Sequence, residues 1–563
     1  MAKIKGQSAQ NSRAGEGNYS GEEYSSLPRR EIVLTMGGVM LALFLASLDQ
    51  TVVSTAMPQI VADLHGFSRY TWVTTAYLVA STTVVPIAGR LSDMYGRKWF
   101  YVAGIIVFLV GSVLAATSQT MTQLILFRAV QGLGGGIMLA NAFIAIGDLF
   151  PPQERGKYQG LLSGVFGVSS VIGPTLGGFI TDSLSWHWIF FINLPLGIPA
   201  IGLFIAFFPN TRPSVRGRHI DYLGLCTMVL AVVPILLALS WAGVDYPWNS
   251  PQIIGALVFG TAMAGLFVVI EGLVPDPIIP LEMFRNRVVS ISILATFLTG
   301  FGMFGAIIFI PLFFQVVLGA SATSSGSFLT PMMLGVVAGT IIGGQAVSRL
   351  NGQYRLVGLS GLSLMGLGMF LLSRMTVQTP FGEAVAYIVV MGLGLGVTFP
   401  LYTIAVQNTV SRQMMGVATS SLQFFRTIGG TLGLAILGSV LNNRFAAQLV
   451  DTVPQGVKEV LSPQVLPGLA RNPQALINPA AGDQLRAAFR SVETGGELLF
   501  QQLLQALRYS LASAITEVFL IGLLAVIVAW LVTILMKEAP AYNHQATAES
   551  GQTKRVGEAT GDD

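Results

Sequence analysis

The chain has few charged residues and a single cysteine. Only 10% of its 563 residues are Asp, Glu, Lys or Arg, whereas 52% are hydrophobic, and an average soluble domain has about 25% charged residues. Cys226 alone cannot form an intrachain disulfide, and the histidines, His65, His187, His219 and His544, show no metal spacing. The mean hydropathy of +0.67 predicts an integral membrane protein, with no metal and no other cofactor. The net charge of +4 indicates membrane topology rather than a nucleic-acid partner.

Apolar runs fill most of the chain, and a run of about 20 residues can cross the bilayer as a helix. We expect fourteen spans, at 33–57, 70–90, 99–118, 122–147, 158–181, 188–208, 221–242, 252–273, 289–316, 325–348, 355–374, 382–409, 414–441 and 513–536. The polar residues 1–30 predict a disordered tail. Roughly two thirds of the 31 Lys and Arg residues lie in the tails and loops on the side of the termini. The positive-inside rule then predicts a multi-pass protein of the cell (inner) membrane with both termini in the cytoplasm.

The two halves of the sequence resemble one another. VQGLGGG at 130–136 returns as VMGLGLG at 390–396, and GPTLGG at 173–178 returns as GGTLGL at 429–434. This repeat predicts an all-α protein of two six-helix bundles, 31–210 and 288–536, with two inserted spans in 211–287 and a cytoplasmic tail at 537–563. The second bundle includes a long outer segment, 443–510. We expect its part from Glu497 to Tyr509 to be an amphipathic helix that lies on the outer surface or caps the last two spans. Parallel repeats are typical of transporters that bind substrate between the halves.

The sequence GRLSDMYGRK, at 89–98, falls in the loop between spans 2 and 3. Gly89 and Gly96 would permit a tight turn, and Asp93 is placed to pair with basic groups and with a helix N-terminus. Arg97 and Lys98 could also be ordinary charges of a positive-inside loop. The combination resembles the signature loop of the major facilitator superfamily, and this resemblance implies that the five residues form a conformational gate.

Four further stretches resemble motifs of that superfamily, in order along the chain. They are LDQTVVSTAMP at 48–58, LILFRAVQGLGGG at 124–136, GVFGVSSVIGPTLGG at 164–178 and WHWIFFINLPLG at 186–197. The first and last resemble the fourteen-span drug:proton antiporter branch, related to the EmrB/QacA type. The resemblance covers about 33–536 and implies the major facilitator fold. The third stretch resembles the antiporter motif, which assigns to it Gly164, Gly173, Pro174, Gly177 and Gly178, whose glycines form a packing groove.

Three ionisable residues, Asp49, Arg128 and Arg426, lie deep within the expected spans, where each charge costs about 2.5–3.5 kcal/mol. Asp49 and Arg128 could form a structural ion pair, but we favour proton coupling, because the proton affinity of a carboxylate depends on its exposure and on nearby cations. Arg426 is a further candidate for coupling, with Glu517 in span 14 as a distant partner. Glu271, near the end of span 8, is expected to snorkel to the membrane surface.

A cavity for lipophilic cargo is lined mainly by apolar and aromatic side chains with a few polar groups. The candidates on cavity-facing helices are Gln50, Tyr77, Gln131, Asn141, Phe301, Phe304, Gln315, Phe399, Tyr402 and Gln407. For each aromatic residue taken alone, helix packing or lipid contact is the simpler explanation.

The leading hypothesis is a monomeric secondary exporter of lipophilic or amphipathic drugs, driven by inward-moving protons. The alternative is an exporter of one physiological cargo, such as a lipid, a glycolipid or a siderophore. A third hypothesis, a membrane-embedded enzyme or a transport-dead sensor, lacks support, since no nucleophile–base cluster is visible. GLGGG at 132–136 lacks the Lys-Ser/Thr of a nucleotide-binding loop and lies within a span.

Overall fold

The computed structural model describes residues 28–64, 69–209, 220–243, 246–318, 322–350, 353–460, 486, 489 and 496–537. Within these ranges fourteen helical segments are long and apolar enough to span a membrane, which confirms the predicted number of spans. The first half contains α3 (Arg29–Asp63), α4 (Tyr70–Tyr95), α5 (Arg97–Ala116), α6 (Met121–Leu149), α7 (Pro152–Ser183), α8 (His187–Phe191) and α9 (Asn193–Phe207). The inserted helices are α10 (Tyr222–Trp241) and α11 (Pro251–Leu273). The second half contains α12 (Arg287–Leu312), α13 (Ala322–Arg349), α14 (Tyr354–Ser373), α15 (Phe381–Thr409), α16 (Met415–Thr452), α17 (Gln455–Val460) and α20 (Gly496–Ile534).

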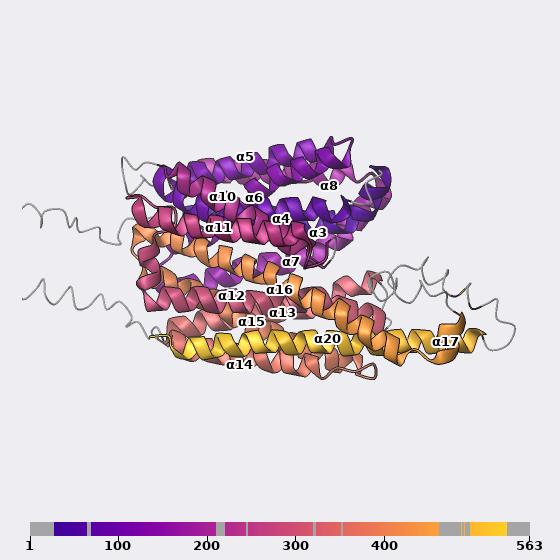
Figure 1. Ribbon diagram of the computed structural model, residues 1–563. Coiled ribbons are helices and arrows are strands. Elements are labelled where there is room, and N and C mark those ends of the chain that lie inside the picture. The colour runs from indigo at the N-terminus through magenta and orange to yellow at the C-terminus, as the bar shows by residue number, and fades with distance from the viewer. Residues whose placement is uncertain are drawn as a thin grey trace, which may run out of the picture.

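The two halves form separate helix bundles that lie against each other (Figure 1). In the first, α6 packs on α4 and α5, and α3 packs on α7 and α9; in the second, α15 packs on α13 and α14, and α12 packs on α16 and α20. An even number of spans brings both ends of the membrane domain to one face, which we name the terminal face. It lies at the left of Figure 1, and α17 lies at the opposite end. The two-bundle fold predicted from the repeat is confirmed.

The repeated glycines let helix backbones come close in both halves. A Cβ on Gly134 of α6 would lie 2.6 Å from the Cα of Phe108 of α5. A Cβ on Gly394 of α15 would lie 2.6 Å from the Cα of Met365 of α14. Small residues at helix crossings permit the close packing that holds membrane helices together. The same glycine pattern therefore makes the same kind of contact in each bundle.

The inserted helices α10 and α11 pack on one another and lie across the junction of the halves. Helix α10 contacts α4 of the first bundle and α16 of the second. Its N-terminus is capped by Asp221, which accepts a hydrogen bond of 2.8 Å from the Gly224 amide. At its other end Trp241 lies 4.7 Å, between ring centroids, from Trp72 at the start of α4.

Two helices extend well beyond the bilayer on the face opposite the termini. Helix α16 has 38 residues and α20 has 39, so each is nearly 60 Å long, about twice the thickness of the hydrocarbon core. The stretch from Glu497 to Tyr509 is helical, as expected. We expected it to lie on the outer surface or to cap the last two spans, but it is the first part of α20 and runs directly into the last span, since no glycine or proline interrupts residues 497–521. Residues 461–485 of the outer segment lie outside the described residues.

Helix α12 continues at the same face into a π-helical turn, Phe313–Val317, labelled η3. Two short 3₁₀ helices, η2 (Leu281–Arg285) and η4 (Arg412–Met414), precede α12 and α16 at the terminal face.

Candidate transport and gating sites

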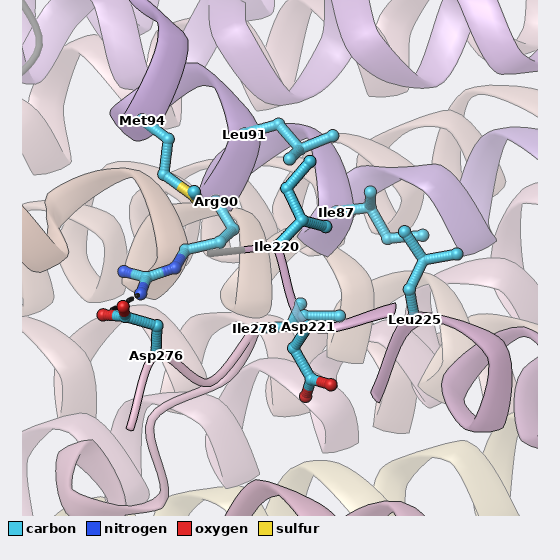
Figure 2. Close-up of a pocket in the computed structure, with 9 residues that line it drawn as sticks. All are labelled: Ile87, Arg90, Leu91, Met94, Ile220, Asp221, Leu225, Asp276 and Ile278. Carbon is cyan, nitrogen blue, oxygen red and sulfur yellow. Dashed lines mark ion pairs between the residues drawn. The ribbon is translucent and has the colours of Figure 1, made fainter. Parts of the chain in front are cut away.

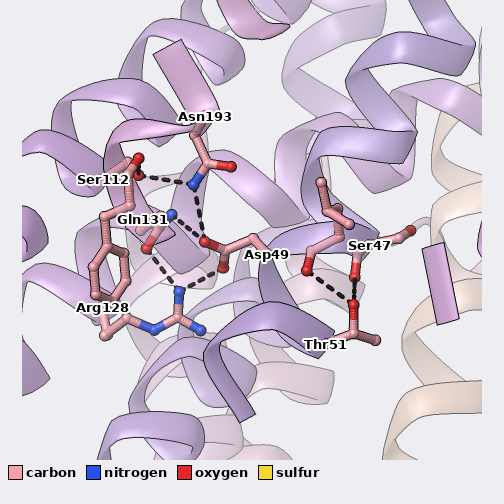
Figure 3. A network of polar contacts seen from close by, with 9 residues as sticks. Ser47, Asp49, Thr51, Ser112, Arg128, Gln131 and Asn193 are labelled. Carbon is pink, nitrogen blue, oxygen red and sulfur yellow. Dashed lines mark hydrogen bonds and ion pairs between the residues drawn. The ribbon is translucent and has the colours of Figure 1, made fainter. Parts of the chain in front are cut away.

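Asp49 lies at the centre of a buried polar network in the first half (Figure 3). Its carboxylate accepts a charge-assisted bond of 2.5 Å from Nη1 of Arg128. It also accepts bonds of 2.8 Å from Nε2 of Gln131 and 3.0 Å from Nδ2 of Asn193. The Asp49 side chain is 0% exposed and that of Arg128 is 2% exposed. Three donors directed at one carboxyl group match its ionised form, which only accepts hydrogen bonds.

Aromatic rings enclose the ion pair. The guanidinium carbon of Arg128 lies 4.4 Å from the ring centroid of Tyr77 on α4 and 5.9 Å from that of Phe190 on α8. Asn193, which begins α9, also donates a hydrogen bond of 2.8 Å to Ser112 of α5. The network therefore ties α3 to α5, α6 and α9 within one bundle, and among the described residues it does not cross to the other half.

Helix α3 is locked to α7 directly after Asp49. The Thr51 hydroxyl donates a hydrogen bond of 3.2 Å to the Ser169 carbonyl of α7. A Cβ on Gly173 would lie 2.6 Å from the Thr51 Cβ, and a Cβ on Gly177 would lie 2.9 Å from the Val52 carbonyl oxygen. These two glycines of the antiporter motif thus let α7 touch the backbone next to Asp49. Pro174 lies between them inside α7.

The other glycines of α7 are oriented differently. Gly164 faces Val337 of α13, and Gly178 has nothing within 4 Å. Nearer the terminal face, a Cβ on Gly160 would lie 2.9 Å from Ile341, also on α13. Helix α7 therefore packs on α3 through one group of glycines and on the other half of the molecule through another.

The residues of the expected gate lie where α4 meets the start of α16. Arg97 pairs with Asp93 at 2.7 Å and also with Asp148 at the end of α6. The Asp93 carboxylate lies against Gly416 at the N-terminus of α16, where the helix dipole favours a negative charge. Lys98 donates a hydrogen bond of 2.8 Å to the Ile205 carbonyl of α9.

The two gate glycines have different roles. Gly96 has φ +95° between α4 and α5, a conformation that favours glycine. Gly89 was also expected in a turn, and this was wrong, because it lies inside α4. A Cβ there would lie 2.7 Å from the Ser420 Cβ and 2.8 Å from the Gly416 carbonyl oxygen. Gly89 is needed for close approach of the two halves.

Polar bonds join the halves at the same face. Arg155 of α7 donates a hydrogen bond of 2.7 Å to the side-chain oxygen of Asn408 on α15. Nε2 of Gln407 donates a bond of 3.2 Å across to the Phe143 carbonyl of α6. Within its own half the same atom donates a bond of 3.3 Å to the Thr419 hydroxyl of α16. Together with the Gly89 contact, these bonds hold the halves against each other at the terminal face.

Helix α4, the start of α10 and the segment after α11 together line a small pocket near this region (Figure 2). Arg90 pairs with Asp276, which follows α11, at 3.7 Å. Glu271 accepts backbone hydrogen bonds of 3.2 Å from Ile278 and 3.3 Å from Ile279 and is 3% exposed. The expectation that Glu271 snorkels was wrong, because its carboxylate satisfies the backbone of the turn that follows its own helix.

Arg426 lies apart from Asp49, in the second bundle. Its Nη1 donates a hydrogen bond of 2.9 Å to Oε1 of Gln423, and its guanidinium carbon lies 4.2 Å from the ring centroid of Phe399 on α15. Glu517 was considered as its partner, and this was wrong. Glu517 pairs instead with Arg444 at 2.9 Å, nearer the outer end of α16.

Five residues predicted for the substrate cavity are held by specific contacts. Tyr77 and Gln131 belong to the Asp49 network, and Gln407 belongs to the contact between the halves. Asn141 donates a hydrogen bond of 2.9 Å to the Ile137 carbonyl of its own helix. Tyr402 shares a hydrogen bond of 2.8 Å with Thr533 of α20.

The other five are placed differently. Gln50 is exposed. Phe399 covers Arg426, and Phe301 and Phe304 lie against glycines of α16. Gln315 is in the π-helical turn, and its side chain lies outside the described part of the structure. Lining of a cavity by these ten residues remains a prediction.

Sequence reasoning did not select several residues of these sites, among them three that contact the Asp49 network or Arg97. Asn193 was visible as a polar residue inside the apolar stretch WHWIFFINLPLG, and Asp148 as an acid at the end of span 4. Ser112 carried no comparable signal, because single serines are common in membrane helices. Their roles become evident only when α5, α6 and α9 are assembled.

The two bundles, the glycine-packed seam between them and the buried ion pair define a multi-pass membrane transporter. The family model of the Major Facilitator Superfamily matches residues 39–434. The chain is 40% identical to the multidrug transporter protein MdtP of Bacillus subtilis, over 93% of this chain and 96% of that protein. It is 39% identical to multidrug resistance protein 3 of the same organism, over 89% of this chain and 94% of that protein. The chain therefore belongs to the Major Facilitator Superfamily.

A solved structure shows the same fold at low sequence identity. The human organic anion transporter MFSD10 (TETRAN) superposes with a TM-score of 0.56 at 13% identity. The match covers 89% of this chain and all of that one.

Proposed function

We propose that this protein is a proton-coupled antiporter that exports lipophilic and amphipathic compounds by alternating access. Its relatives named as multidrug transporters support the cargo class. The bias of Lys and Arg toward the terminal face supports a cell-membrane location with both termini in the cytoplasm. One chain contains both bundles, so the proposed working unit is a monomer.

The observation that carries the proposal is the enclosed Asp49–Arg128 pair. A charged pair inside the bilayer is costly, and among the described residues every donor that contacts Asp49 comes from the first bundle. Protonating the carboxyl group would remove the charge that holds Arg128, Gln131 and Asn193 around it. Asp49 is sealed in this conformation, so a proton must reach it after α3 moves relative to α6.

A mechanical connection links this site to the seam between the halves. Thr51 and Val52 contact α7 at Gly173 and Gly177, and α7 packs along α13 of the other half. A shift of α3 caused by protonation would therefore displace a helix of the seam. Each proton moved inward contributes about 2.3 kcal/mol per 100 mV of membrane potential.

Asp49→Asn tests the coupling. In everted vesicles the variant should lose proton movement on addition of dyes and pH-gradient-driven dye transport, while its expression and folding match those of the wild type. Asp451→Asn, at the exposed end of α16, is the control and should transport normally. Undiminished gradient-driven transport by Asp49→Asn contradicts the proposal. Responses to many unrelated dyes distinguish a drug exporter from an exporter of one physiological cargo.

A further inference from the structure

Arg426 is a buried cation without an acidic partner among the described residues. It lies eleven residues into α16, about 16 Å along the helix axis, and it is 7% exposed. The carboxylates of the second bundle are engaged or located elsewhere: Glu517 pairs with Arg444, and Glu383 accepts a hydrogen bond from Tyr387 near the opposite membrane face. Arg128, in contrast, is neutralised by Asp49.

Part of the Arg426 guanidinium remains available for a ligand. Of its five N–H donors, one binds Gln423, while the Phe399 ring stacks at 4.2 Å. In the described part of the structure Nε and Nη2 have no hydrogen-bond partner. Nε and Nη2 of Arg426 are also not fully enclosed by protein, whereas Nε of Arg128 is fully enclosed. The side of the guanidinium formed by Nε and Nη2 presents two parallel donors, the arrangement that binds a carboxylate in a bidentate manner.

Gln423 supplies a second, independent sign of a ligand. Its Oε1 accepts the bond from Arg426, which fixes the amide so that Nε2 is the remaining donor. Nε2 is buried and has no partner among the described residues, and Gln423 is 5% exposed. An unsatisfied buried donor costs about 1–3 kcal/mol. Because Nε2 is enclosed in this conformation, an anion bound beside Arg426 would satisfy both side chains only after a change of conformation uncovers the Gln423 amide.

We propose that Arg426, Gln423 and Phe399 form a recognition site for the carboxylate of lipophilic acids carried by this transporter. Phe399 stacks on the guanidinium and orients it, and Gln423 donates to a ligand oxygen once its enclosed Nε2 is uncovered by a change of conformation. In this conformation Asp49 is enclosed and accepts bonds from three donors, whereas part of the Arg426 guanidinium is accessible. Of the charges around Asp49 and around Arg426, the accessible one is therefore positive. The inference rests on the proposed export function and specifies one cargo class.

The test uses three ligands that share one ring system: 1-pyrenebutyrate, its neutral amide and 1-pyrenebutylamine. Binding to the purified full chain in detergent is measured by energy transfer from tryptophan to pyrene. We expect the wild type to bind the acid at least tenfold more tightly than the amide or the amine. Arg426→Gln should lose this preference and change amide affinity less than twofold. Arg426→Lys should recover only part of it, because lysine lacks the fork of donors.

Arg374→Gln is the matched control, because Arg374 also lies over a phenylalanine ring, at 5.2 Å from Phe370, but is exposed. It should keep the preference for the acid. Equal affinity of the wild type for acid and amide, or an unchanged preference in Arg426→Gln, overturns the inference. An equal loss of acid and amide affinity also overturns it, since that indicates a structural role.

Transport assays separate this inference from the proposed function. If vesicles export neutral dyes but the acid binds no better than the amide, only the carboxylate site fails. If the preference depends on Arg426 but no dye moves with the proton gradient, only the proposed antiport fails.

Discussion

Arg155 of α7 and Asn408 of α15 share a hydrogen bond of 2.7 Å that joins the two halves of the transporter at the terminal face. Asn408 also donates a bond of 2.9 Å to the Tyr354 hydroxyl of α14, so it is anchored within its own half. A conformation open at this face must break the bond to Arg155. The contact thus contributes to the balance between the two states of an alternating-access cycle.

Asn408→Ala should shift that balance toward the state open at the terminal face. One side-chain hydrogen bond contributes about 1 kcal/mol, which corresponds to roughly a fivefold change in population. The measurement is maleimide labelling of Thr419→Cys in a Cys226→Ser background, because Cys226 is the single cysteine of the sequence and Thr419 is fully buried at this seam. Ser363→Ala, which removes a bond inside the second half, should leave the labelling rate unchanged. Equal labelling rates in the Thr419→Cys background, in Asn408→Ala and in Ser363→Ala would show that the bond between Arg155 and Asn408 does not stabilise the closed state.

Gly177→Ala and Gly178→Ala should differ strongly although the residues are adjacent. The added methyl group at 177 would lie 2.9 Å from the Val52 carbonyl oxygen, whereas at 178 it meets nothing within 4 Å. Overpacking of this kind costs about 1–3 kcal/mol. We expect at least a tenfold lower export rate for the first variant and wild-type export for the second, measured as dye efflux at matched expression. Similar rates for the two would show that the contact of α7 with α3 is unimportant.

Arg128→Met should destabilise the protein more than Asp49→Asn. Breaking a buried ion pair costs about 3–5 kcal/mol. The first change removes every polar contact of the guanidinium and leaves Asp49 with only the amide donors of Gln131 and Asn193. The second change keeps one side-chain oxygen that can accept from Arg128, which also keeps Gln131 and the Tyr77 ring as partners. Thermal unfolding of the purified proteins measures the difference, and the double variant should regain part of the loss. A lower melting temperature for Asp49→Asn than for Arg128→Met would contradict this order.

Glu271→Leu should loosen the turn between α11 and α12. Removing the carboxylate leaves the amides of Ile278 and Ile279 without their acceptor, at about 1–3 kcal/mol for each group. We expect faster thermolysin cleavage in residues 274–280, whereas Glu271→Gln retains one acceptor oxygen and should be cleaved at an intermediate rate. Cleavage as slow as in the wild type would show that the turn does not depend on Glu271.

Much of the fold could be predicted from the sequence because bilayer thickness fixes the length of each apolar run. The repeated glycines gave the two-bundle arrangement, since small residues are required where helix backbones cross. The sequence also singled out Asp49 and Arg128, because charges in apolar runs are rare. The predictions for Gly89 and Glu271 were wrong. Near the end of a span, the local sequence does not distinguish a turn from a packed helix, and it does not distinguish an acid that snorkels from one that is buried.

The number of spans, their arrangement in two related bundles and the residues whose charge is costly in the membrane follow from the sequence alone, because these depend on composition and local spacing. The partners of those residues became known only from the assembled helices. Asp49 is 144 residues from Asn193, and Arg97 is 51 residues from Asp148. Arg426 proved to have no acid beside it among the described residues. Such contacts depend on how helices distant in sequence are rotated and packed, which no local pattern specifies.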